Sequence, residues 1–188
     1  EKYIQEDTEL PVLSQREADI KCARHLLWIL GTEEGRQAVF AGYDLSGLDL
    51  SHRNLNQAVF TGSRMTGTNL EETELCFSDF SNVQMINCSL KGITAEEARF
   101  QDVFMEHCDC QGAYFTHSDF TNARIMDSCL DHSKWLNCYG DRIVFRNTST
   151  KQAVMPKIFR QQCREGAGKP FAAVHLHAAG ENVYFTSE

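Results

Sequence analysis

Basic charge and long apolar runs are scarce in this chain of 188 residues. Only 18 Lys and Arg stand against 26 Asp and Glu, which gives a formal net charge of −8. Proteins that bind nucleic acid or anionic membranes through a general basic field need clustered Lys and Arg, so this balance argues against both. The longest apolar run, Leu26 to Leu30, has five residues. Because a transmembrane helix needs about 20, we expect no membrane span.

Recognisable catalytic motifs are also missing. The sequence has no Gly-rich phosphate loop, no nucleophile elbow and no zinc-protease motif. His175 and His177 share one face of a predicted strand, which is only a weak metal signal. Acidic pairs such as Glu96 and Glu97 fall on outward positions, where no concave pocket excludes water. We therefore expect a protein that is not an enzyme, with no catalytic residue, no metal and no cofactor.

What the chain does contain is enough apolar material for one compact domain. Hydrophobic residues make up 42% of the sequence and aromatic residues 10%, so global disorder is not expected. Four of the eight cysteines, Cys88, Cys108, Cys110 and Cys138, fall on inward positions, where Cys acts as a small apolar side chain. A reduced, cytoplasmic environment is the economical interpretation, with secretion as the alternative.

A strict period of five runs through the middle of the chain. Every fifth residue from Phe40 to Phe145 is bulky and apolar at 19 of 22 positions. The residue two places earlier is Ala, Ser, Thr or Cys in 15 of the 22 units, and Gly, Asn and Asp, which tolerate turns, recur two places later. Neither a helix, with a period of about 3.6, nor a strand, with a period of about 2, keeps phase with five. Each unit therefore predicts one short side of a coil, with two inward side chains and then a corner.

A longer period of 20 tests this interpretation, because four such sides close a square coil. Coils stacked about 4.8 Å apart should show matched columns of residues at that interval. One column, from Leu45 to Ile125, is aliphatic throughout. Another consists of five phenylalanines whose rings would stack along the core: Phe40, Phe60, Phe80, Phe100 and Phe120.

At these residues the sequence resembles the pentapeptide-repeat family, whose motif is A-(D/N)-L-x-x. Thr68-Asn69-Leu70 and Ser78-Asp79-Phe80 are among the segments that carry the motif most plainly. The resemblance covers residues 38–147 and implies an all-β solenoid, a right-handed quadrilateral β-helix of about five to six coils. Tyr43, Leu48 and Arg53 depart from the motif. We therefore expect an irregular first coil. An inward Arg53 would be costly unless it were paired, so we expect Arg53 to lie at the open end or at a corner.

An open solenoid end exposes core and unpaired backbone, so each end needs a cap. Residues 1–37 predict a helical cap, with a Ser14 and Glu17 capping box, a helical pattern from Gln15 to Leu30 and a stop at Gly31. A partner-binding helix is the alternative. The apolar side expected to cover the first coil consists of Ile20, Ala23, Leu26, Leu27 and Leu30.

Residues 148–188 are expected to close the other end. Pro156 to Arg164 predicts a short helix that stops at Gly166. Beyond it, Phe171 to His177 and Asn182 to Ser187 resemble two strands of a hairpin.

The coil pattern also sorts the outward residues into two candidate surfaces. One is an apolar stripe on successive coils, interpreted either as a dimer or partner contact or as a surface that the C-terminal segment covers: Ile86, Phe104, Met126 and Val144. The other is an acidic face, interpreted as a recognition strip or simply as a soluble surface, with Lys91 as its one base: Asp49, Glu71, Asp109 and Asp131.

These surfaces favour a non-catalytic interaction module that presents a rigid acidic rod to a protein partner. The alternative implied by the resemblance is a DNA mimic that inhibits or protects a type II topoisomerase such as gyrase. Residues 38–147 carry a net charge of −7, whereas duplex DNA of the same length would carry about 15 negative charges, so mimicry stands second. A second alternative is the repeat domain of a secreted bacterial effector that acts on a host protein. Neither direct nucleic-acid binding nor membrane binding is expected.

Overall fold

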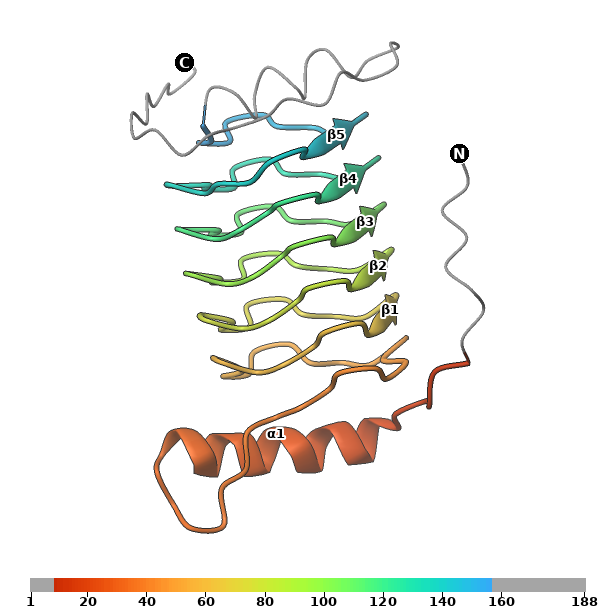
Figure 1. Cartoon of the computed structure of the whole chain (residues 1–188), viewed down its shortest axis with the longest axis vertical. Coiled ribbons are helices and arrows are strands. Elements are labelled where there is room, and N and C mark those ends of the chain that lie inside the picture. Colours follow the sequence, from red (N-terminus) through yellow and green to blue (C-terminus); the bar gives the residue numbers. More distant parts are fainter. Residues whose placement is uncertain (1–8, 157–188) are drawn as a thin grey trace.

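The computed structural model describes residues 9–156, and within it the chain winds into stacked coils with one helix across the first (Figure 1). Each coil has four sides, and residues on every side form parallel bridges with residues 20 positions further along. The all-β quadrilateral solenoid predicted from the period of five is thereby confirmed.

The regular strands all lie on one side of the coil and form one parallel sheet in chain order. In each strand the central residue is buried and its two neighbours face outward. This side therefore presents two outward rows of side chains, whereas the other three sides hold isolated bridges within the described residues. The strands are β1 (Arg64–Thr66), β2 (Gln84–Ile86), β3 (Phe104–Glu106), β4 (Arg124–Met126) and β5 (Val144–Arg146).

A column of aromatic rings runs through the interior. Neighbouring ring centroids lie 4.4 to 5.1 Å apart, and the ring planes are within 13° of parallel. This offset stacking adds to the burial of the rings. The predicted core column is confirmed in full: Phe40, Phe60, Phe80, Phe100 and Phe120.

The column ends at Gly140 because the backbone there lies too close to the preceding coil for any side chain. A Cβ at this position would lie 2.7 Å from the backbone of Phe120 and Thr121. Trp135, from another side of the coil, fills this level, and its ring centroid lies 4.5 Å from that of Phe120. The Trp135 indole N–H is satisfied by the Ser133 hydroxyl at 2.8 Å.

The corners explain why Asn, Asp and Gly follow many of the large residues. Asn82 and Asn122 both have a φ of +59°, in the left-handed region that these residue types tolerate. Corner side chains also join successive coils: Asn122 donates to Asp102, and Asn147 donates to Asp127, both at 2.9 Å. The corner residues therefore turn the chain and bind one coil to the next.

The N-terminal cap is the helix α1 (Gln15–Ile29), which lies across the open end of the first coil (Figure 1). Its capping box is present, since Ser14 accepts from the Glu17 N–H and the Glu17 carboxylate accepts from the Ser14 N–H. Gly31 follows the helix with a φ of +74°. The predicted helix is confirmed to within one residue at its C-terminal end.

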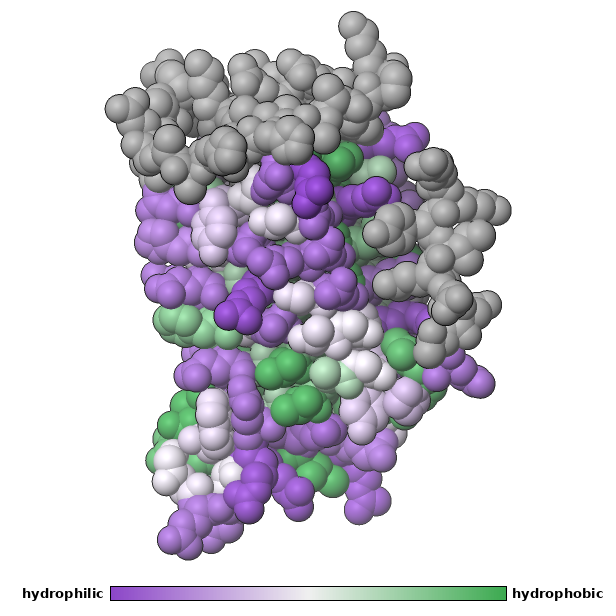
Figure 2. Space-filling view, viewed as in Figure 1, coloured by the Kyte–Doolittle hydropathy of each residue, from purple (hydrophilic) through white to green (hydrophobic). Residues whose placement is uncertain are grey.

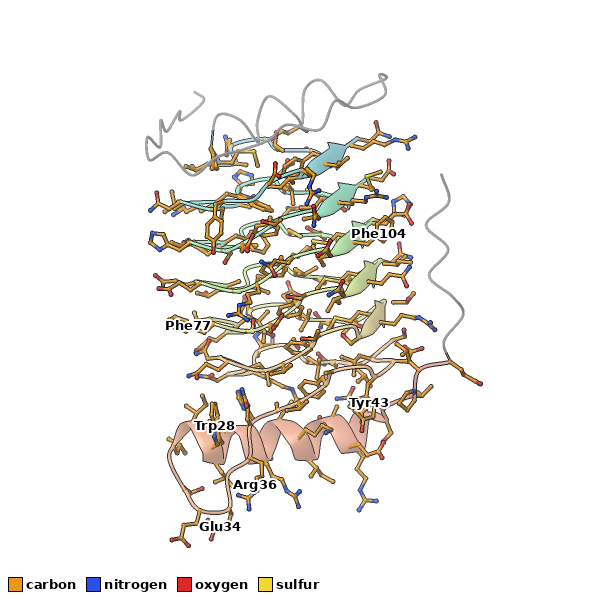
Figure 3. All side chains as sticks on the ribbon, viewed as in Figure 1. Trp28, Glu34, Arg36, Tyr43, Phe77 and Phe104 are labelled. Atoms are coloured by element: carbon orange, nitrogen blue, oxygen red, sulfur yellow. The ribbon has the colours of Figure 1, made fainter. Side chains whose placement is uncertain are left out.

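The expected orientation of α1, however, is wrong. The side chains buried against the coil are those of Ala18, Cys22 and His25. Figure 3 shows Trp28 on the same coil-facing side, where its ring stacks on His25 with the centroids 5.3 Å apart. The side expected to be buried instead faces solvent and consists of exposed residues: Ile20, Ala23, Leu26, Leu27 and Leu30.

The physical reason is that the first coil has no preceding coil to pair its backbone. Gln15 takes the place of a neighbouring strand, because its side chain donates to the Asp49 carbonyl at 2.9 Å and accepts the Asp49 N–H at 2.8 Å. His25 accepts the Ala38 N–H at 3.0 Å and donates to the Asn56 carbonyl at 3.0 Å. Aliphatic side chains cannot satisfy these groups, so α1 turns its polar side toward the coil.

Two further contacts complete the cap. On the strand side, the Asp44 N–H donates to the Pro11 carbonyl at 2.9 Å, and the Leu13 N–H donates to the Asp44 carbonyl at 3.0 Å. Arg53 forms an ion pair with Asp19 of α1 at 2.7 Å. Arg53 thus lies at the open end, as expected, and its charge is paired there.

The solenoid continues past the boundary predicted at residue 147. Ser149 bridges to Cys129 and Val154 bridges to Lys134, so residues 148–156 extend the last coil rather than the C-terminal cap. The last two units depart from the motif, so the sequence pattern did not include them in the solenoid. These units are Thr148-Ser149-Thr150 and Ala153-Val154-Met155. The predicted C-terminal helix and hairpin lie outside the described residues.

Candidate interaction surfaces

The four residues of the predicted apolar stripe lie on the side of the coil that carries the strands. Phe104 and Val144 begin β3 and β5, whereas Ile86 and Met126 end β2 and β4. They therefore alternate between the two outward rows, and the apolar surface runs as a zigzag from coil to coil. Figure 3 shows Phe104 at the outer edge of the strand side.

Polar side chains fill the alternate positions of this surface. Strand register places Phe104 beside Arg124 in one row and Met126 beside Arg146 in the other. All four apolar side chains are half-buried. The result is a mixed surface, in which the residues of the apolar stripe alternate with polar side chains. These polar side chains belong to Gln84, Glu106, Arg124 and Arg146.

The predicted acidic face holds its acids in contacts within the rod. Asp109 pairs with Lys91 at 3.1 Å, and this hydrogen bond raises the pKa of Lys91. Asp49 accepts from the Ser51 hydroxyl at 2.6 Å and from the Ser51 N–H at 3.1 Å. These bonds lower the pKa of Asp49.

Asp131 is held in the same way by the next coil. It accepts from the Ser149 hydroxyl at 2.5 Å and from the Lys151 N–H at 2.8 Å. Burial opposes the ionisation of Asp131, but these bonds outweigh it and lower its pKa. Glu71 is half-buried on the same face. Because Lys151 belongs to the solenoid, Lys91 is not the only base on this face, and the acidic strip is weaker than the sequence suggested.

The structure also exposes large apolar side chains that the sequence did not predict to be on the surface. Phe77 is 54% exposed at a corner with a φ of +59°, and Figure 3 shows it on the side of the rod opposite Phe104. Its position two places after a large residue was a usable signal, because aromatic residues are rare at such corners. Tyr114, Tyr139 and Val39 are exposed on the outer sides as well.

The buried cysteines act as small core residues. Burial raises the pKa of the Cys138 thiol to about 12 and that of Cys110 well above its ordinary value, so both stay protonated at neutral pH. Across residues 9–156, no group of three His, Cys, Asp or Glu side chains is arranged to hold a metal ion. In the same part of the chain, no helix has the length and apolar character needed to cross a bilayer.

These features define a class of protein: a parallel β-solenoid with a filled core, whose outward residues differ from coil to coil. A family model described as pentapeptide repeats matches residues 54–92 and 96–131, in 8 copies. Residues 54–92 and 96–131 are thus pentapeptide repeats. A comparison with curated protein sequences finds no match.

Solved structures of other pentapeptide-repeat proteins have the same fold. HetL, involved in heterocyst differentiation regulation in the cyanobacterium Nostoc sp. strain PCC 7120, aligns with a TM-score of 0.60 at 22% identity, over 63% of this chain and 56% of HetL. Rfr23 from the cyanobacterium Cyanothece 51142 aligns with a TM-score of 0.56 at 15% identity, over 60% of this chain and 90% of Rfr23. The chain thus spans little more than half of HetL. At these identities the likeness concerns the fold alone.

Proposed function

We propose that this protein is a non-catalytic scaffold that binds a protein partner on the strand side of its solenoid, within the cytoplasm. The observation that carries the proposal is the zigzag of Ile86, Phe104, Met126 and Val144 on four successive coils. A rigid parallel sheet fixes the spacing of these groups at about 4.8 Å per coil. Apolar groups surrounded by polar ones are typical of a protein contact.

Charge makes DNA mimicry the weaker alternative. A mimic needs acids that face a partner freely, whereas Asp49, Asp109 and Asp131 are engaged by residues of the rod. The strand side also carries Arg64, Arg124 and Arg146 in its outward rows. A surface of mixed charge that carries the apolar stripe is more complementary to an ordinary protein surface than to the groove in which an enzyme binds DNA.

The test disrupts the apolar stripe without disturbing the core. Phe104→Asp combined with Met126→Asp changes two outward side chains and leaves the inward Met105 and Ile125 in place. Phe77→Asp is the matched control, because it removes an exposed aromatic group from another side of the rod. We expect quantitative affinity capture from a lysate to lose its bound protein with the double variant and to retain it with the control.

Two results would count against the proposal. Capture that is equal for the wild type and a folded double variant would mean that the strand side is not the contact. Inhibition of purified gyrase by the wild type and by the double variant alike would instead favour mimicry. Circular dichroism of each variant establishes that the solenoid is intact.

A further inference from the structure

The outer side of α1 is an apolar surface that the capping arrangement leaves in solvent. Ile20 is 44% exposed, Leu27 38% and Leu30 68%, and Ala23 is exposed between them. These four residues follow one another at intervals of three, four and three, which is the a and d spacing of a helix-to-helix seam. Figure 2 shows green, apolar residues at the lower end of the molecule, where α1 lies.

Opposite charges flank the apolar residues at the two ends of this surface, and Arg24 lies between them. Arg16 lies one helical turn before the apolar residues and continues the same spacing. Glu33 and Glu34 follow the helix on an exposed loop, and Figure 3 shows Glu34 beyond the helix, away from the coils. Arg36 holds this loop by donating to two of its carbonyls at 2.8 and 2.6 Å. The N-terminal end therefore presents Arg16, beside the Glu17 carboxylate that Ser14 binds, and the C-terminal end is acidic.

We propose that the outer side of α1 binds the same surface of a second copy of this chain, with the two helices antiparallel. Two-fold symmetry makes the contact self-complementary, because the basic end of each helix then meets the acidic end of the other. The a and d positions interleave in this register. The facing pairs are Ile20 with Leu30, Ala23 with Leu27, and Arg16 with Glu34.

A second copy fits this surface better than an acidic partner helix, which would meet the repulsion of Glu33 and Glu34. The coils extend from the opposite side of α1 (Figure 1), so the two rods point away from each other without collision. Arg24 is the unfavourable group, since it lies beside the two-fold axis and faces its own copy. A helix of 15 residues covers less area than the roughly 800 Å² per partner of a standard interface, so we expect a weak, concentration-dependent dimer.

Sedimentation velocity of the full chain tests the proposal, over about 1 to 300 μM, a range chosen for micromolar affinity. We expect the wild type to shift from monomer to dimer within this range. Leu27→Asp should remain monomeric throughout, because it places a charge in the seam on the side of α1 away from the coil. Phe77→Asp is the control and should dimerise as the wild type does.

A charge reversal tests the register. Arg16→Glu alone, or Glu33→Lys with Glu34→Lys, should weaken the dimer by roughly tenfold, and the combination should restore it. Arg24→Gln should tighten the dimer, because it removes the like-charge pair at the axis. A structural role of α1 alone would not produce this restoration.

Several results would overturn the proposal. A wild type that stays monomeric at every concentration would show that another segment of the chain, or nothing, covers the surface. A dimer that survives Leu27→Asp would use a different surface. If the wild type remained monomeric and bound anionic vesicles, and Leu27→Asp abolished that binding, the surface would be assigned to a membrane. Failure of the combined charge variant to regain the affinity lost by the single reversals would exclude the antiparallel register.

Discussion

His25 is held in one neutral tautomer by two backbone groups of the solenoid. One ring nitrogen accepts the Ala38 N–H and therefore carries no proton, while the other donates to the Asn56 carbonyl. Burial lowers the pKa of His25. A second proton would have to replace the Ala38 hydrogen bond, so the folded protein resists protonation at this residue.

Protonation of His25 should make stability fall at acidic pH. The unfolded chain takes up a proton below a pKa of about 6.5, whereas the folded chain does not until lower pH. The stabilisation is thus present above pH 6.5 and is lost below it, by at most about 1.4 kcal/mol per pH unit. Urea unfolding at pH 7.5 and 5.5 gives the pH dependence of the free energy of unfolding for the wild type and for His25→Gln. The other histidines contribute to both proteins alike, so the difference between the two isolates His25. An identical pH dependence in the two proteins would refute the assignment.

At the scale of the element, α1 shows that an apolar side need not be the buried side. Amphipathic patterning assumes that the surface beneath a helix is apolar, but the end of a β-solenoid also presents unpaired N–H and C=O groups. Gln15, Lys21 and His25 bind these groups, and small residues such as Ala18 fit between them. The aliphatic residues of α1 are then free to face a second molecule.

Replacement of Gln15 should therefore loosen the cap. Gln15→Ala removes the acceptor and donor that serve Asp49, and we expect a loss of about 1 to 2 kcal/mol from the free energy of unfolding. Arg24→Ala, on the outer side of the same helix, should change it by less than about 0.5 kcal/mol. Chemical denaturation of both variants gives the comparison. Equal effects would mean that α1 is not held by its polar side.

At the scale of the whole molecule, stability is distributed along a stack in which each coil touches only its neighbours. The Phe80 ring stacks on two others, with centroid distances of 4.4 and 5.1 Å. The Phe40 ring stacks on Phe60 alone, at 5.0 Å, and α1 covers its other side. The centre of the rod should therefore be more sensitive to a core substitution than the end that α1 caps.

Truncation of a ring in the stack measures this difference. We expect Phe80→Ala to lower the free energy of unfolding by about 3 to 5 kcal/mol, the usual range for a buried phenylalanine. Phe40→Ala should fall at or below the lower end of that range. Denaturation curves for both variants, followed by circular dichroism, give the values. A larger loss for Phe40→Ala would show that stability is concentrated at the capped end.

The sequence by itself determined the solenoid, its four sides and its core columns, because a period of five allows each residue only one inward or outward position. It also determined the existence of α1, through the capping box of Ser14 and Glu17 and the helical pattern that follows. Only the tertiary structure decided the orientation of α1 and the pairing of surface charges. Orientation depends on unpaired backbone groups, which have no signature in side-chain hydrophobicity. The ion pair of Asp109 with Lys91 and the hydrogen bond of Asp131 with Ser149 each join residues 18 positions apart. These residues become neighbours only when the coils stack.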